Sequence, residues 1–175
     1  MKTATYILAV ATFIVAPSLS ATQSAIVLGI QPSAGELSPE VQLAMARGDE
    51  LSGRLRYDAA VREYARAADV ARREGHLASG TMWKLATTHY NNGNLVGAAA
   101  ALDQLTAEAA LVGDLEVEAL SLYYAAWLDG KAGRGSEMAA RVARLEWLLR
   151  SAYIRVALRE RLSGWLSDSR EVAAR

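Results

Sequence analysis

The fold is decided by the stretch YDAAVREY at residues 57–64, because the chain returns to the same pattern 38 positions later, as LVGAAAAL at residues 95–102. Small residues coincide at Ala60 and Ala98, and a large residue follows four positions later in each copy. A repeat of this period indicates one helical unit that cannot bury its apolar face alone and must pack against its neighbours. The sequence therefore predicts an all-α fold built from repeated helical hairpins.

The composition suits a single helical domain without a strong electrostatic field. The chain has 175 residues, of which 19 are basic and 19 acidic, so it has no net charge with which to attract nucleic acid. Hydrophobic residues make up 52% of the chain and only one Phe occurs, a balance that favours closely packed helices over sheets. Cysteine is absent, which excludes disulfides, thiolate metal sites and a lipidated cysteine. We therefore expect helix packing alone to stabilise the fold.

The N-terminal segment has the pattern of a secretory signal. Lys2 precedes an apolar run at residues 6–16, and small residues follow at 17–21. A run of this length is too short to cross the ~30 Å hydrocarbon layer as a helix, whereas it matches the hydrophobic region of a signal peptide. We expect cleavage after Ser20 to remove residues 1–20 and the protein to be exported, to the periplasm or the extracellular space.

The segment that follows leaves alternatives open. Residues 21–37 lack a sustained helical period and contain turn formers at 31–35, which predicts a flexible lead-in. Within it, residues 25–28 form a second apolar stretch that could pack on the domain as a short extended piece. The same stretch could instead help the signal segment to stay as an uncleaved anchor, which would be the chain's one contact with a membrane.

Caps, breakers and apolar spacing predict a helical domain over residues 38–167 and a C-terminal tail at 168–175. Ser38, Pro39 and Glu40 supply the cap residue, the first-turn proline and the acid that open the first helix. The expected helical stretches are 38–51, 57–74, 79–91, 98–109, 117–127, 136–149 and 152–166. The last of them carries one apolar stripe, so we expect it to cover the open end of the row of helices.

The repeated slots resemble the tetratricopeptide repeat, in which small residues occupy the crossing of two helices and a large residue opens the second helix. The matching positions are Gly48, Tyr57, Ala60, Tyr64 and Ala67 in the first copy and Leu85, Ala86, Gly93, Leu95, Ala98, Leu102 and Leu105 in the second. The resemblance implies a right-handed stack of hairpins with two clear repeats and a degenerate third, closed by a C-terminal capping helix. The chain departs from the pattern at Leu55, where the family has a turn glycine, and at Gly135, where a large residue belongs. An unrelated α-helical bundle is the alternative.

Tetratricopeptide domains hold a peptide or protein in a concave groove lined by the first helix of each pair, so the resemblance implies an exported, non-enzymatic scaffold for an unidentified protein partner. The groove positions carried over from the family are Trp83, Lys84, Thr87, Tyr90, Asn91, Tyr123, Tyr124 and Trp127. Exposed Trp and Tyr side chains would give a partner a large contact area, but the rings of Tyr124 and Trp127 could equally pack against the neighbouring repeat. The exposed first helix at one end could also support a homodimer.

Groups suited to catalysis or metal binding are few. His76 and His89 have no metal-ligand spacing, and GKAGRG at 130–135 lacks the strand and the Gly-Lys-Ser/Thr ending of a phosphate loop. The scattered carboxylates are expected to cap helices or face solvent. A solvated outer face is expected for the arginines of the second helices: Arg62, Arg66, Arg72, Arg73, Arg141, Arg144 and Arg150. We therefore expect no catalytic site, metal, cofactor or nucleic-acid partner. The alternative function is a small helical envelope protein that binds a ligand such as a glycan through its aromatic residues.

Overall fold

Seven helices make up the described part of the chain. The computed structural model describes residues 37–173, so the predicted signal segment at 1–20 and all of the predicted lead-in except Leu37 lie outside it. The helices are α2 (Pro39–Gly53), α3 (Tyr57–Arg73), α4 (Ser79–Asn91), α5 (Leu95–Val112), α6 (Leu115–Lys131), α7 (Gly135–Leu148) and α8 (Val156–Ala173). No strand occurs within residues 37–173, and the predicted all-α class is confirmed there.

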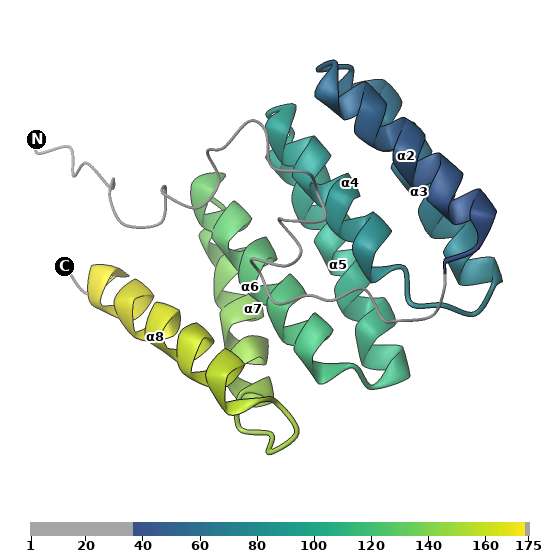
Figure 1. The fold of residues 1–175 in the computed structure, drawn as a ribbon. Helices are drawn as coiled ribbons and strands as arrows, with labels where there is room; N and C mark the ends of the chain where they lie inside the picture. Colours follow the sequence, from purple (N-terminus) through teal and green to yellow (C-terminus); the bar gives the residue numbers. More distant parts are fainter. Residues whose placement is uncertain (1–36, 174–175) are drawn as a thin grey trace, which may run out of the picture.

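The helices follow one another in space in the order in which they occur in the chain, with α2 and α3 at one end and α8 at the other (Figure 1). Short turns join α2 through α7, so that successive helices run in opposite directions and pack mainly on their neighbours in sequence. Helix α8 buries Leu158, Leu162 and Leu166 against the core. It continues to Ala173, so most of the stretch predicted as a C-terminal tail, residues 168–175, is helical.

Five turns share one backbone geometry and give the structure its period. One or two residues after the end of each helix from α2 to α6 comes a residue with positive φ, namely Leu55, Gly75, Gly93, Gly113 and Gly133. In every one of these turns the next residue donates its N–H, at 2.9 Å, to the carbonyl five positions earlier, which is the bond of a Schellman motif. The turns between the two helices of a pair recur at 55, 93 and 133, and those between pairs at 75 and 113. Equivalent turns therefore recur in the backbone with about the same period as the sequence repeat.

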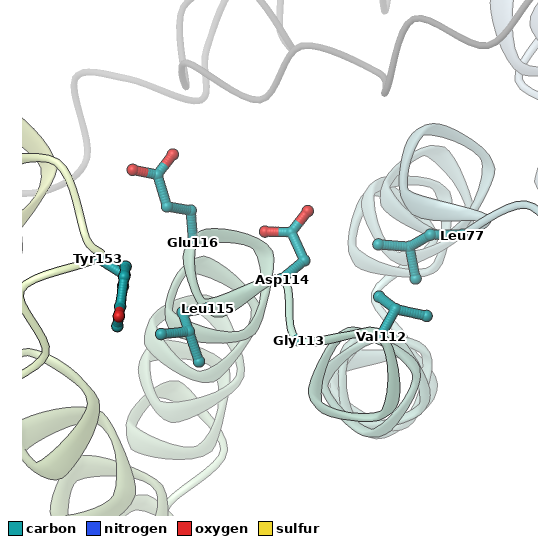
Figure 2. A pocket seen from close by; sticks show the side chains of 7 residues that line it. All are labelled: Leu77, Val112, Gly113, Asp114, Leu115, Glu116 and Tyr153. Carbon is teal, nitrogen blue, oxygen red and sulfur yellow. The ribbon is translucent and has the colours of Figure 1, made fainter.

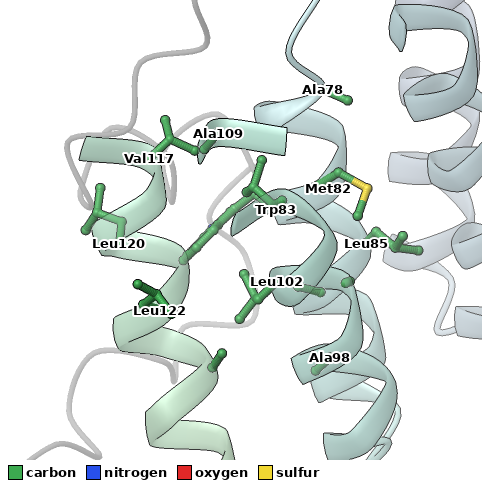
Figure 3. Close-up of a cluster of buried hydrophobic side chains, with 14 of the residues drawn as sticks. Ala78, Met82, Trp83, Leu85, Ala98, Leu102, Ala109, Val117, Leu120 and Leu122 are labelled. Carbon is green, nitrogen blue, oxygen red and sulfur yellow. The ribbon is translucent and has the colours of Figure 1, made fainter. Parts of the chain in front are cut away.

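Small residues allow the helices to approach closely. A Cβ atom on Gly48 would lie 2.5 Å from Cε1 of Tyr64, so the α3 ring packs directly on the backbone of α2. Ala60, Ala67 and Ala98 are completely buried on the second helices of the first two pairs. Larger apolar side chains fill the spaces between successive pairs, as Figure 3 shows for the cluster between α4, α5 and α6.

Helix α5 is, within residues 37–173, the one helix long and apolar enough to cross a membrane by length and composition. A helix packed in the core of a protein can have the same length and apolar composition. Here α4 and α6 both pack on α5, and Leu102, Leu105 and Ala109 are buried in those contacts. Packing therefore accounts for the apolar face of α5.

The Leu55 turn should become more stable with glycine. A left-handed conformation costs a residue with a Cβ roughly 1–2 kcal/mol, and the 71% exposed Leu55 side chain has little packing to lose. Because glycine also gains freedom in the unfolded chain, we expect Leu55→Gly to raise the free energy of unfolding by about 0.5–1 kcal/mol in urea titrations. The reverse change at the equivalent turn, Gly93→Leu, should lower it. A less stable Leu55→Gly protein would contradict this reading of the turn.

The contact between Gly48 and Tyr64 predicts a clash on adding one methyl group. Gly48→Ala should destabilise the fold by roughly 1–3 kcal/mol, the usual cost of overpacking a core, even though alanine favours helices. Gly53→Ala is the matched control, because no atom lies within 4 Å of the Cβ position there. Thermal unfolding should show a lower melting temperature for the first variant alone; equal melting temperatures would refute the close crossing.

Candidate functional site

A chain of four aromatic rings connects α4, α6 and α8. The centroid of Trp83 on α4 lies 4.6 Å from that of Tyr124 on α6. Tyr124 in turn lies 4.6 Å from Tyr123, and Tyr123 lies 4.7 Å from Trp165 on α8. The ring planes meet at 76° or 84°, which is the edge-to-face arrangement favoured by the ring quadrupoles. These contacts link three alternate helices, α4, α6 and α8.

Trp83 is a packing residue. Its side chain is buried, at 8% exposed, and extends from α4 toward Leu120 and Leu122 of α6 (Figure 3). The expectation that Trp83 presents an open contact surface was therefore wrong, because α6 covers the face of α4 on which it lies. Tyr124 is also mostly enclosed, and burial raises the pKa of its hydroxyl, with a further rise from the neighbouring Tyr123.

Lys84 meets a carboxylate within the protein. Its Nζ lies 2.5 and 2.6 Å from the two carboxylate oxygens of Asp49 on α2, and the lysine side chain is only 10% exposed. Tyr64 of α3 donates its hydroxyl hydrogen to the same carboxylate at 2.6 Å, and burial together with this hydrogen bond raises the pKa of Tyr64. Lys84 thus ties α2, α3 and α4 together, and its charge is already compensated.

The other predicted contact residues remain accessible at the junction of α4 and α6. The rings of Tyr90 and Trp127 are partly exposed, with centroids 5.5 Å apart and planes tilted by 44°. Lys131 Nζ lies 4.7 Å from the centroid of Trp127, a cation–π distance. Thr87 is partly exposed and Asn91 is exposed, one turn apart on α4.

We call this surface the aromatic face. Its members are Thr87, Tyr90, Asn91, Tyr123, Trp127, Lys131 and Trp165. Lys131 and Trp165 were not among the predicted contact residues. The spacing of Lys131, four residues after Trp127 on one helix, was the signal that could have found it. No sequence signal paired Trp165 with Tyr123, because their contact depends on how α8 folds back on α6.

Some arginines of the second helices form ion pairs with acids on other helices, although five of the seven expected on a solvated face are exposed: Arg62, Arg66, Arg73, Arg144 and Arg150. Asp129 of α6 is completely buried and accepts hydrogen bonds from Arg134 and from Arg141 of α7. Arg141 also donates to both carboxylate oxygens of Asp103 on α5, at 3.1 and 2.6 Å. One guanidinium therefore joins α5, α6 and α7. The prediction of a solvated Arg141 was wrong, because the sequence does not reveal that two acids on other helices face it.

Two more arginines pair with acids on other helices, and of these Arg144 is exposed as expected. Arg144 of α7 donates to the buried carboxylate of Glu118 on α6 at 3.0 and 2.7 Å. Arg72 of α3 donates to Glu108 on α5 at 2.7 Å. The acids of these pairs thus connect helices: Glu118 joins α6 to α7, and Glu108 joins α5 to α3.

The histidines lie apart from the aromatic face. His76 is exposed in the turn after α3. His89 is partly buried, with Nδ1 3.4 Å from Nδ2 of Asn94, and burial lowers its pKa although Asp58 opposes that shift. Between residues 37 and 173 no three His, Cys, Asp or Glu side chains are grouped so that they could hold a metal ion.

The chain matches no protein-family model, no curated protein and no solved structure among those compared with it.

The burial of Asp129 predicts a large cost for removing its charge. Asp129→Asn keeps the shape but leaves Arg134 and Arg141 without their buried anion, so we expect a loss of roughly 3 kcal/mol in the free energy of unfolding. Asp103→Asn makes the same change at an exposed partner of the same Arg141 and should cost less than about 1 kcal/mol. Denaturant titration of both variants measures the difference. Similar losses would mean that burial of Asp129 has no energetic effect.

Proposed function

We propose that the protein is an exported, non-enzymatic scaffold of the tetratricopeptide-repeat type that holds a protein or peptide partner on its aromatic face. The observation that carries the proposal is the partly exposed pair of rings formed by Tyr90 and Trp127, with Lys131 beside them, where α4 and α6 meet. Export follows from the signal pattern at residues 1–20.

Three features support the repeat family. The turns with positive φ recur with the period of the sequence repeat. Gly48 lies where the first two helices cross, in contact with Tyr64, as the small position of the family requires. Contacts also join every second helix, through Trp83 between α4 and α6 and through Arg72 between α3 and α5. A right-handed stack of hairpins would produce such contacts in two parallel rows.

The aromatic face suits a polypeptide partner for physical reasons. Trp and Tyr offer large contact areas and few rotatable bonds, so little conformational entropy is lost on binding. The rings of Tyr90 and Tyr123 are already held by Trp127 and Trp165, which preorganises the surface. The amide of Asn91 can bond a peptide backbone, and Lys131 offers a positive charge to an acidic group.

The glycan-binding alternative is weaker on this geometry. It needed Trp83, Tyr123 and Trp127 as open stacking surfaces, but Trp83 is buried between α4 and α6. Trp127 and Tyr123 retain partial exposure. Quenching of tryptophan fluorescence by added sugars would favour this alternative.

Photo-crosslinking in the producing cells tests the scaffold directly. A photoreactive residue at Asn91 or Lys131, in the full-length chain, should capture a discrete partner, whereas the same residue at the exposed Ala107 of α5 should not. The double variant Tyr90→Ala/Trp127→Ala should reduce the yield at least tenfold, since two anchor side chains at the centre of a contact each contribute more than about 1 kcal/mol.

The matched control removes exposed apolar surface elsewhere. Leu43→Ala on α2 is exposed and outside the aromatic face, so it should leave the crosslinks unchanged. Equal capture from Ala107, or capture unaffected by the double variant, would rule out the aromatic face as the binding surface. Melting temperatures of the variants show whether each remains folded.

A further inference from the structure

Two of the turns with positive φ bring side chains together as well as backbones. In the α6–α7 turn, Arg134 donates its backbone N–H to the carbonyl of Asp129 and its guanidinium Nε–H to the carboxylate of the same residue, both at 2.9 Å. In the α4–α5 turn, Asn94 donates its backbone N–H to the carbonyl of His89, and its side-chain Nδ2 lies 3.4 Å from Nδ1 of the ring. A titratable ring therefore contacts the residue that caps α5.

The cap determines which end of the Asn94 amide meets the ring. Oδ1 of Asn94 accepts the N–H of Gly97 at 2.8 Å, so Nδ2 is the end that faces His89. The NH2 group of an amide donates hydrogen bonds and does not accept them. Nδ1 of His89 can therefore hold this contact only through its lone pair, which requires a neutral ring with its hydrogen on Nε2.

This contact has little room to adjust. A Cβ atom on Gly97 would lie 2.6 Å from Nδ2 of Asn94 and 2.9 Å from Nδ1 of His89, so both groups lie directly against the backbone in the first turn of α5. A proton on Nδ1 would place two donors against each other. The amide then has to move away from the ring or turn its oxygen toward it, and the N–H of Gly97 loses its acceptor.

Asp58 of α3 and the burial of the ring act on the pKa of His89 in opposite directions. Burial has the larger effect and lowers this pKa from its ordinary value of 6.5, whereas the charge of Asp58 raises it. Asn92 donates to the Asp58 carboxylate at 2.9 Å. Further charged side chains on α4 and on the helices around it are Glu63, Lys84, Asp103 and Lys131. The ring is thus neutral at pH 7 and takes up its proton in acid.

The α5–α6 turn has the same backbone geometry with different chemistry. Asp114 occupies the cap position and accepts the N–H of Val117 at 3.0 Å, and Ala109 stands where the other turn has His89. Figure 2 shows Asp114 beside Glu116 at the wall of a pocket, and no histidine is among the residues that line it. An ionised carboxylate has only acceptor atoms. This cap therefore has no donor that a protonated ring could oppose.

We propose that the α4–α5 turn is an acid-sensitive cap, in which neutral His89 holds the amide of Asn94 in its capping position and protonation of the ring releases the N–H of Gly97. Acid then weakens the start of α5, while α6 keeps its carboxylate cap. The device belongs to the fold and is independent of any partner on the aromatic face.

NMR titration of the full-length chain tests the link between ring and cap. The sequence has two histidines, so His76→Gln leaves His89 as the one histidine that titrates. Its ring signals should have a midpoint below pH 6.5, and the amide signal of Gly97 should move with the same midpoint. The matched variant in this background is Asn94→Ser, which keeps a capping side chain but has no amide to meet the ring. There the Gly97 signal should no longer follow His89.

Thermal unfolding tests the consequence for stability. Because the unfolded chain binds the His89 proton more tightly than the folded one, the stabilisation is complete above pH 6.5 and is lost as the pH falls below it. Between about pH 7.5 and pH 5, the melting temperature of the His76→Gln protein should fall by about 2–4 °C, the shift that losing one helix cap produces in a chain of this size.

Adding Asn94→Asp should remove this fall, because a carboxylate accepts hydrogen bonds from a protonated ring and from Gly97 together. The other titrating groups are common to both proteins, so the difference between them belongs to His89 and its cap. An equal fall in both proteins would overturn the proposal. A Gly97 signal that ignores the His89 midpoint, or that follows it equally in the Asn94→Ser variant, would overturn it as well.

Discussion

Close approach of helix backbones is the constraint on which the other contacts depend. At the first crossing the ring of Tyr64 packs against Gly48, and Ala60, Ala67 and Ala98 are fully buried. Small residues at the crossings leave room for large side chains only where one pair of helices meets the next. The Trp83–Tyr124 contact lies at such a junction, so the same constraint that holds each pair together determines where aromatic rings gather.

The third pair is stabilised by a different interaction. Helix α7 buries only Leu145 and Leu148, whereas its arginines bind acids on α5 and α6. A buried ion pair contributes little net stability because desolvation offsets the attraction, but it strongly disfavours arrangements that leave the charge unpaired. We therefore ascribe the position of α7 to Asp129 and Glu118. This explains why the third copy of the apolar pattern looks degenerate in sequence while its helices still pack closely.

Local signals predicted most of the described fold, since they depend on neighbouring residues. Ser38 caps the first helix as expected, and the helices expected at 57–74 and 79–91 end at Arg73 and Asn91. The contact site was predicted only in part. Periodicity shows which face of α4 carries Trp83, but not that α6 covers it. In the same way, the sequence near each arginine does not reveal the acid that another helix places opposite it.

The contact of α8 with α6 determines how many helices the aromatic face spans. Trp165 lies against Tyr123, where the first helix of a further pair would otherwise pack, so the row ends there. The aromatic face is then three helices wide, from α4 to α8. Two helix spacings correspond to roughly 16–20 Å, which an extended chain covers with about five or six residues. The terminal helix therefore sets the extent of the aromatic face, and under the proposed function it would limit the length of peptide that the face can contact.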